Sequence, residues 1–275
     1  MNKAFVDTTI LTDILLKVSN KRTQASEALK KYDSTELPLY AIKEFKAGPL
    51  RNMVWMYNKF HQTKSFEKAL RCLQTISQSP KKYLTATAIE SMVLGAHNIK
   101  NLSTQDLVDK YGPNAKLDFV LKDRFKYTIK TKVLVAWNKR RKVTSSVCQE
   151  LFCFKERNPY EIDGQLFLDP MKCDEDEGCC LSLQLKDRLE DLVKIRETLE
   201  SMPVKPETQR RLRVIRGIIR KPKSLLTDKQ CRDLGDIYFV LFSPKDSVIL
   251  TTNTSDFVPL ASSLSKRVES PNPLD

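Results

Sequence analysis

Residues 3–16 read KAFVDTTILTDILL, and the order of their side chains predicts a β-strand followed directly by an α-helix. The apolar run ends at Asp7, and Ile10, Ile14 and Leu15 then recur with the spacing of one helical face. Asp7 is therefore expected at the carboxyl end of a strand, the edge at which open α/β sheets bind ligands. The same aspartate can instead simply cap the helix that follows it.

The far end of the chain carries similar chemistry on a second strand. Residues 247–257, SVILTTNTSDF, predict a strand with polar groups at its tip, and residues 231–242, CRDLGDIYFVLF, predict an apolar helix with acids near its start. Closer to the N-terminus, residues 37–42 predict a short strand leading into a helix that carries Glu44 in its first turn. Strands alternating with helices in this way are typical of a parallel sheet.

These motifs resemble the signatures of the PIN-domain family of metal-dependent nucleases, which are an apolar strand ending in VDT or VDN, an acid on an early helix, a GD helix and a TTN..DF strand end. The matching acids in this chain are Asp7, Glu44, Asp236 and Asp256. The resemblance implies an α/β fold, namely a PIN-like three-layer α/β/α sandwich with a parallel central sheet, plus a mostly helical basic insertion. It also implies phosphodiester cleavage that leaves a 5′-phosphate and a 3′-hydroxyl.

The expected domain organisation is discontinuous. Residues 1–98 and 224–268 are expected to form the PIN-like domain, residues 99–223 a basic insertion or cap, and residues 269–275 a disordered tail. Within the insertion, the local patterns predict extended segments at 126–130 and 132–137, and helices at 181–202 and 207–220.

The acids point to a metal site. Carboxylates held close together raise one another's pKa values unless a cation neutralises them, and Mg²⁺ and Mn²⁺ prefer oxygen ligands. A bound metal ion acidifies a water molecule for attack on a phosphodiester. We assign Asp7 and Asp236 as the main metal ligands, and Glu44 and Asp256 as supporting ligands that act directly or through water.

Three other polar residues accompany these acids. Thr8 and Asn253 are expected to orient water or the carboxylates. Asp233, one helical turn before Asp236, could share or take over its role. The chain has only two histidines and they are far apart in sequence, so a histidine-based mechanism is poorly supported.

The charge of the chain favours a polyanionic partner. The formal net charge is +13, which fits nucleic acid. The predicted helix 207–220 carries a stripe of arginines, reinforced by Arg210 and Arg211, and a second basic group follows residues 132–137. The stripe can also bind an acidic protein, or pair with the acidic run at 174–177. The residues expected to bind nucleic acid are Arg213, Arg216, Arg220, Lys139, Arg140, Arg141 and Trp137.

The sequence thus predicts a metal-dependent endoribonuclease, with RNA preferred over DNA because most PIN-like proteins act on RNA and because interleaved aromatic and basic residues suit unpaired strands. One alternative is a catalytically silent PIN-like module that binds RNA or protein, favoured by Thr254 at a position where many family members have an acid. Another is a toxin or defence nuclease held in check by a protein partner.

The remaining expectations concern location and cysteines. No stretch is apolar enough to span a bilayer, and the N-terminus lacks a signal-peptide pattern, so we expect a cytoplasmic protein without a membrane partner. The seven cysteines fit a reducing compartment. A structural zinc site among the five cysteines at 148–180 is a less favoured alternative, because their spacing is irregular.

Overall fold

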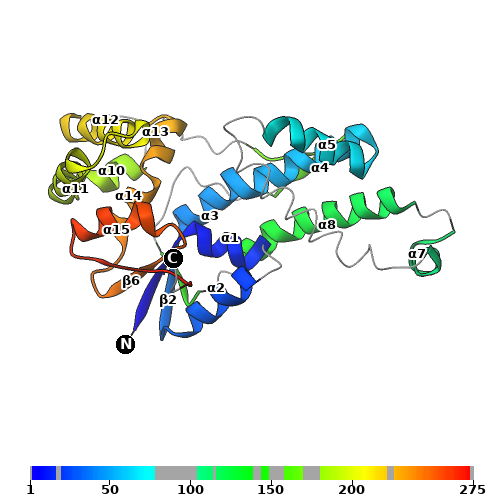
Figure 1. The fold of residues 1–275 in the computed structure, drawn as a ribbon, viewed down its shortest axis with the longest axis horizontal. Helices are drawn as coiled ribbons and strands as arrows, with labels where there is room; N and C mark the ends of the chain where they lie inside the picture. The colour runs from blue at the N-terminus through cyan, green and yellow to red at the C-terminus, as the bar shows by residue number, and fades with distance from the viewer. Residues whose placement is uncertain are drawn as a thin grey trace.

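The computed structural model describes residues 2–16, 20–77, 104–113, 116–138, 144–148, 158–169, 180–221 and 226–272. Within these residues, five parallel strands form the central sheet in the order β3-β2-β1-β6-β7 (Figure 1). The strands are β1 (Lys3–Val6), β2 (Ser34–Pro38), β3 (Ser146–Cys148), β6 (Ser247–Leu250) and β7 (Arg267–Glu269). The predicted α/β class and parallel sheet are confirmed.

The two ends of the chain meet in the middle of this sheet. β1 pairs with β6 in a register that places Val6 opposite Leu250, and the Asp7 amide donates to the Leu250 carbonyl at 3.0 Å. From β1 the chain proceeds outward to β2 and β3, whereas from β6 it proceeds in the other direction to β7. The strand order therefore reverses between β1 and β6, and such a switch point is where ligands bind in open α/β sheets.

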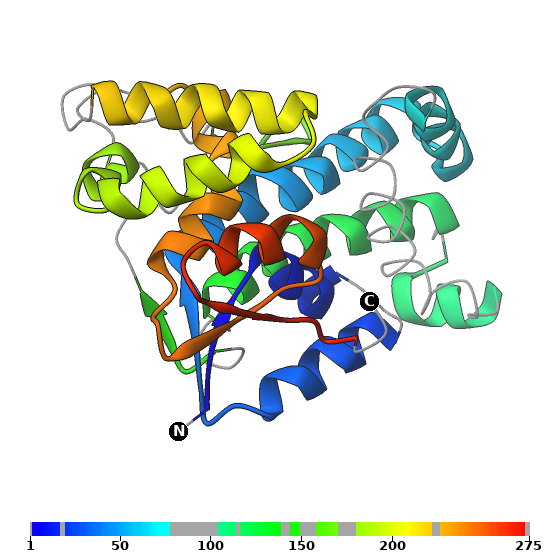
Figure 2. The same cartoon turned by 60° about the vertical axis from the view of Figure 1, so that its left-hand side comes forward.

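Helices cover the sheet on both faces. In Figure 1, α1 and α2 lie to the right of the strands, and α14 and α15 lie to the left. Two further groups, α4, α5 and α8 on one side and α10–α13 on the other, extend the molecule in opposite directions in Figure 1, and Figure 2 shows α11 and α12 lying side by side in the second group. The helices on or near the sheet are α1 (Thr8–Leu16), α2 (Asn20–Lys30), α3 (Leu39–Phe45), α14 (Gly235–Phe242) and α15 (Thr254–Ser262). The others are the π-helical turn η1 (Lys46–Leu50), α4 (Arg51–Thr63), α5 (Phe66–Ser77), α7 (Thr104–Tyr111), α8 (Leu117–Asn138), α10 (Cys180–Lys186), α11 (Leu189–Ser201), α12 (Pro206–Arg220) and α13 (Asp228–Asp233).

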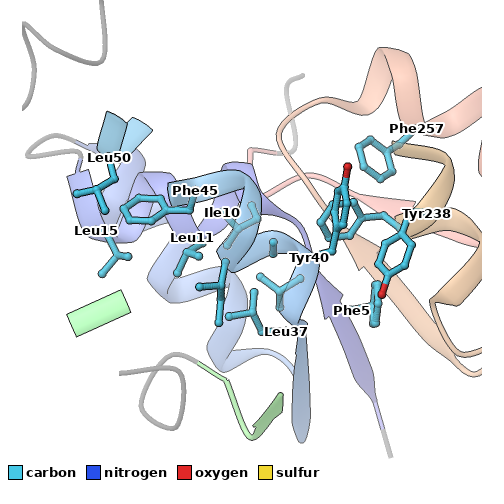
Figure 3. Packing of buried hydrophobic residues seen from close by; sticks show 14 of the residues in the cluster. Phe5, Ile10, Leu11, Leu15, Leu37, Tyr40, Phe45, Leu50, Tyr238 and Phe257 are labelled. Carbon is cyan, nitrogen blue, oxygen red and sulfur yellow. The ribbon is translucent and has the colours of Figure 1, made fainter. Parts of the chain in front are cut away.

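An aromatic core fixes the helices that carry the site. Phe5 on β1 meets Phe239 on α14 edge to face, with ring centroids 6.1 Å apart, and Tyr40 on α3 lies 4.7 Å from Tyr238 (Figure 3). The Tyr40 hydroxyl also donates to the Cys231 carbonyl at 2.7 Å, which joins α3 to α13. Each such ring contributes about 1.5–3 kcal/mol by its burial, so α3 and α14 are held firmly beside β1.

Some predicted segments differ from the structure. Residues 126–130 and 132–137, expected to be extended, belong to the single helix α8. The β-branched residues there favoured strands locally, but Leu121, Phe125 and Ile129 recur every four residues and are buried, which is the pattern of a helix packed on the core. The predicted strand at 37–42 is also shifted, because β2 ends at Pro38 and α3 begins at Leu39.

Two predicted helices are each divided. Residues 181–202 form α10 and α11, which are separated by a turn at Asp187 and Arg188, and the acids Glu190 and Asp191 fit the start of a new helix. Residues 231–242 fall in α13 and α14, with Leu234 between them. This second break allows α14 to begin at Gly235, beside the carboxyl edge of the sheet.

The segment expected to be an insertion takes part in the sheet and its packing. β3 pairs with β2 at the sheet edge, with Cys148 opposite Pro38. The hairpin β4 (Tyr160–Ile162) and β5 (Gln165–Phe167) is fixed to α4 by two hydrogen bonds of 2.8 Å between Asn58 and Leu166. At the C-terminus, β7 extends to Glu269, which lies within the expected tail, and residues 273–275 of that tail lie outside the described residues. Among the described helices, none combines the length and apolar character needed to cross a membrane.

Candidate functional site

Asp7 lies at the carboxyl end of β1 and accepts three short hydrogen bonds. The Thr8 amide donates to Asp7 Oδ1 at 2.6 Å, and the hydroxyls of Thr9 and Thr251 donate to Oδ2 at 2.7 Å. Only 3% of Asp7 is exposed. The Thr251 hydroxyl comes from the end of the neighbouring strand β6 and not from α1, so this buried, fixed carboxylate does more than start α1.

Glu44 is joined to Asp7 through Thr8. The Thr8 hydroxyl donates to Glu44 Oε2 at 2.5 Å, while the amide of the same residue holds Asp7. Glu44 lies in the second turn of α3 rather than in the first turn, because α3 begins directly after β2. The other carboxylate oxygen of Glu44 lies against Gly235, where an added Cβ would collide with it. The GD motif therefore has a steric reason, since Gly235 leaves room for Glu44 beside Asp236.

Asp236 lies in the first turn of α14 and pairs with an arginine from α12. Arg211 Nη2 donates to Asp236 Oδ2, and it also lies 3.5 Å from Glu207 Oε1 and 3.9 Å from Asp256 Oδ2. Arg211 is nearly buried, with 10% of its side chain exposed. We expected this arginine to strengthen an exposed basic stripe, and that expectation was wrong, because Arg211 lies on the buried side of α12 and pairs with Asp236.

Asp256 is more exposed than Asp7 and Asp236. It lies in the first turn of α15 and accepts from Asn253 Nδ2 at 3.0 Å. This hydrogen bond places the Asn253 amide at the Asp256 carboxylate, and the role of Asn253 in the site stays a prediction. We refer to Asp7, Glu44, Asp236 and Asp256 as the carboxylate cluster.

Asp233 lies apart from the pairings that join the cluster. It ends α13 and pairs with Arg210, whose Nε lies 3.2 Å from Asp233 Oδ1. The arginine beside it in sequence, Arg211, pairs with Asp236 instead. Two adjacent arginines thus pair with two different acids. Of these two acids, Asp236 is the one that belongs to the carboxylate cluster.

Burial raises the pKa values of Asp7, Glu44 and Asp236, and repulsion between the carboxylates adds to this effect at Glu44 and Asp236. Burial, followed by the nearby Asp7 charge, raises the pKa of Glu44 to about 8. Burial raises the pKa of Asp236 to about 7, although the Arg211 charge opposes this shift. Burial also raises the pKa of Asp7, and the hydrogen bonds from Thr9 and Thr251 offset only part of the effect. In the absence of a bound metal ion, ionisation of Asp7, Glu44 and Asp236 therefore destabilises the folded state.

We expect the metal-free protein to lose stability as the pH rises from 5 to 8. The folded pKa values of Glu44 and Asp236 lie above their unfolded values, so the folded state binds more protons in this window and stability falls with increasing pH. The melting temperature should fall by roughly 5 °C or more. Differential scanning fluorimetry with EDTA measures it. Glu44→Gln should flatten the profile, whereas Glu27→Gln, at an exposed helical position, should leave it unchanged. Equal slopes in all three proteins would contradict this assignment.

The donor types of the cluster suit a hard divalent cation, but the cluster is not arranged as a ready-made metal cage. Carboxylate, hydroxyl and amide oxygens are the ligands that Mg²⁺ and Mn²⁺ prefer. Among the residues that the structure describes, however, no three Asp, Glu, His or Cys side chains converge closely enough to hold a metal ion. Arg211 instead provides the positive charge near Asp236 and Asp256. The expected ligands are thus brought to one place without forming a complete coordination shell.

The residues expected to bind nucleic acid are only partly described. Arg213, Arg216 and Arg220 are exposed on α12, and Arg216 pairs with Glu200 at 2.9 Å. Lys139, Arg140 and Arg141 lie outside the described residues, as does the side chain of Trp137. Cys153, Cys173 and Cys179 of the zinc alternative also lie outside them.

Sequence reasoning missed two roles in the site. Arg211 was grouped with the stripe because local periodicity does not distinguish a buried arginine from an exposed one. Thr251 had a readable signal, because it follows β6 just as Asp7 follows β1 and the two strands are parallel neighbours. Comparison of the chain with protein-family models, with curated proteins and with solved structures found no match.

Proposed function

We propose that the protein is a metal-dependent endonuclease of the PIN-like type that hydrolyses RNA. The observation that carries this proposal is that Asp7, Glu44 and Asp236 are neighbours at the switch point of a parallel sheet, with raised pKa values that a divalent cation would relieve. A chain gains no stability from holding such acids together, so a ligand-binding role explains them better than a structural one.

The residues of the site fall into three roles in this mechanism, which are metal ligands, supporting ligands and hydrogen-bond donors that position the ligands. Asp7 and Asp236 would hold the metal ion, and Glu44 and Asp256 would support it directly or through water. A metal ion bound there supplies an acidified water and neutralises charge on the phosphate. Thr8 fixes the orientation of Glu44, while Thr9 and Thr251 fix that of Asp7, so the carboxylates are positioned before substrate arrives.

RNA is the favoured substrate for two reasons, namely the resemblance to the PIN-domain family and the exposed aromatic and basic side chains of α8. Tyr127 is 59% exposed, and the Arg124 guanidinium lies 5.5 Å from the centre of its ring. Phe119 is equally exposed and lies beneath Lys122 at 5.6 Å. Rings of this kind stack on unpaired bases, and the cations beside them attract phosphates.

A catalytically silent RNA-binding module is the second candidate. The ion pair between Arg211 and Asp236 favours it, because this pair satisfies part of the cluster without a metal ion. The two candidates differ in one measurable property, since only the nuclease turns over nucleic acid.

The test is cleavage of end-labelled single-stranded RNA and DNA of matched sequence, each with Mn²⁺, Mg²⁺ or EDTA. We expect cleavage of RNA that requires the metal and that disappears in Asp7→Asn. Salt-sensitive binding without cleavage by the wild-type protein, under every metal condition, would support the silent module. Cleavage that persists equally in Asp7→Asn would indicate a contaminating nuclease and contradict the proposed site.

A further inference from the structure

The carboxylate cluster contains its own cation. Arg211 reaches it from the buried side of α12, where Val214, Ile215 and Ile218 also face the protein. Its guanidinium donates to Asp236 and lies within 4 Å of Asp256. Arg213, two residues further along the same helix, is exposed. Packing of α12 against α11 and α13 therefore holds Arg211 in the site.

The guanidinium of Arg211 does not make all of the hydrogen bonds that a buried structural arginine normally makes. Its Nε is shielded from solvent and has no hydrogen-bond partner within the described part of the chain. Buried polar groups are nearly always paired when their role is purely structural. The pair formed by Arg210 and Asp233 provides a comparison. The Arg210 side chain is more exposed than that of Arg211, and the pair lies outside the carboxylate cluster.

The position of Arg211 has an electrostatic consequence for metal binding. A divalent ion held by Asp236 would lie within a few ångströms of the guanidinium, and the two positive charges would repel each other. Both cations would also compete for the same carboxylate oxygens of Asp236 and Asp256. The observed partner of Asp236 is therefore a guanidinium that lies where it would oppose a metal ion.

We propose that Arg211 is an internal competitor of the divalent metal ion, which weakens metal binding at Asp236 in the protein without nucleic acid. This inference rests on the proposed nuclease site and adds to it a built-in restraint. The Arg211 guanidinium lies at the carboxylate that would bind the metal ion, so metal binding requires the ion pair between Arg211 and Asp236 to break.

Titration of metal-free protein with Mn²⁺, followed by calorimetry and by the electron paramagnetic resonance signal of free Mn²⁺, tests this restraint without any activity assay. Arg211→Gln removes the charge but keeps an amide that can donate to Asp236, and it should bind Mn²⁺ at least about tenfold more tightly than wild type. Arg211→Lys keeps the charge and should bind as weakly as wild type. Arg210→Gln, which makes the same charge change at the pair outside the cluster, should also resemble wild type.

The outcomes separate this inference from the proposed function. If the wild-type protein binds Mn²⁺ and Arg211→Gln binds it equally or more weakly, the proposed competition by Arg211 is contradicted, while the proposed metal site still stands. Equal tightening by Arg210→Gln would also overturn that competition, since a general charge effect would then be responsible. Absence of Mn²⁺ binding in every variant would overturn both. Adding Asp7→Asn to Arg211→Gln should abolish the gained affinity, which would place the bound ion at the cluster. Should Arg211→Gln fail to fold, Arg211→Met, which keeps the apolar stem, carries the same prediction.

Discussion

Asp236→Asn is expected to lower kcat/KM for RNA cleavage by about a thousandfold, or roughly 4 kcal/mol of transition-state stabilisation. The amide has the same shape as the carboxylate, and its oxygen still accepts from Arg211, so we expect the fold and the contact with Arg211 to be retained. The negative charge that would bind the metal ion is lost. Single-turnover cleavage of labelled RNA at saturating Mn²⁺ measures the effect, and thermal unfolding checks that the variant is folded.

The matched control for this variant is Asp233→Asn. Asp233 lies three residues before Asp236 and also pairs with an arginine, but it contacts Arg210 and not Arg211. Its loss removes one partly exposed ion pair, which is typically worth up to about 1 kcal/mol. Cleavage should therefore stay close to the wild-type rate. A larger loss of cleavage in Asp233→Asn than in Asp236→Asn would show that Asp233 supplies the acid of this helix.

Gly235→Ala is expected to reduce cleavage by about a hundredfold while changing stability by less than about 1 kcal/mol. The added Cβ would collide with Glu44 Oε1, and the flexible end of the Glu44 side chain is the part that can move away. That movement breaks the hydrogen bond from the Thr8 hydroxyl and misplaces the carboxylate. Urea unfolding and cleavage rates of the same preparation separate the two effects.

Gly217→Ala provides the comparison on α12. A Cβ at Gly217 would meet no atom within 4 Å, so this substitution should stabilise the protein by about 0.5–1 kcal/mol through helix propensity alone. Cleavage should be unchanged. If Gly235→Ala behaved in the same way, with full activity and increased stability, the contact between Gly235 and Glu44 would have no part in the site.

Local sequence patterns were sufficient for the elements that carry the acids. The apolar run before Asp7 predicted β1, and the spacing of Ile10, Ile14 and Leu15 predicted α1. The strand at 247–250 and the parallel sheet were also predicted. These features depend on periodicity within short windows, where side-chain order and backbone conformation are directly coupled.

Local patterns failed where tertiary packing decided the outcome. The segment 126–137 contains β-branched residues that favour strands, but it continues a helix whose buried residues Leu121, Phe125 and Ile129 pack against the core at four-residue spacing. The helix expected at 231–242 is broken so that α14 can begin beside the sheet edge. Neither result could be read from residues that are neighbours in sequence.

The sequence by itself determined which acids this protein has at its strand and helix ends, and therefore the oxygen-ligand chemistry available to it. Only the tertiary structure decided that Thr8 joins Asp7 to Glu44, that Gly235 makes room for Glu44, and that Arg211 pairs with Asp236. The physical reason is that these contacts join residues separated by 25 or more positions in the sequence. The one exception is the hydrogen bond from the Thr8 amide to its neighbour Asp7. Their geometry depends on how α3, α12 and α14 pack around β1, and no local pattern encodes that packing.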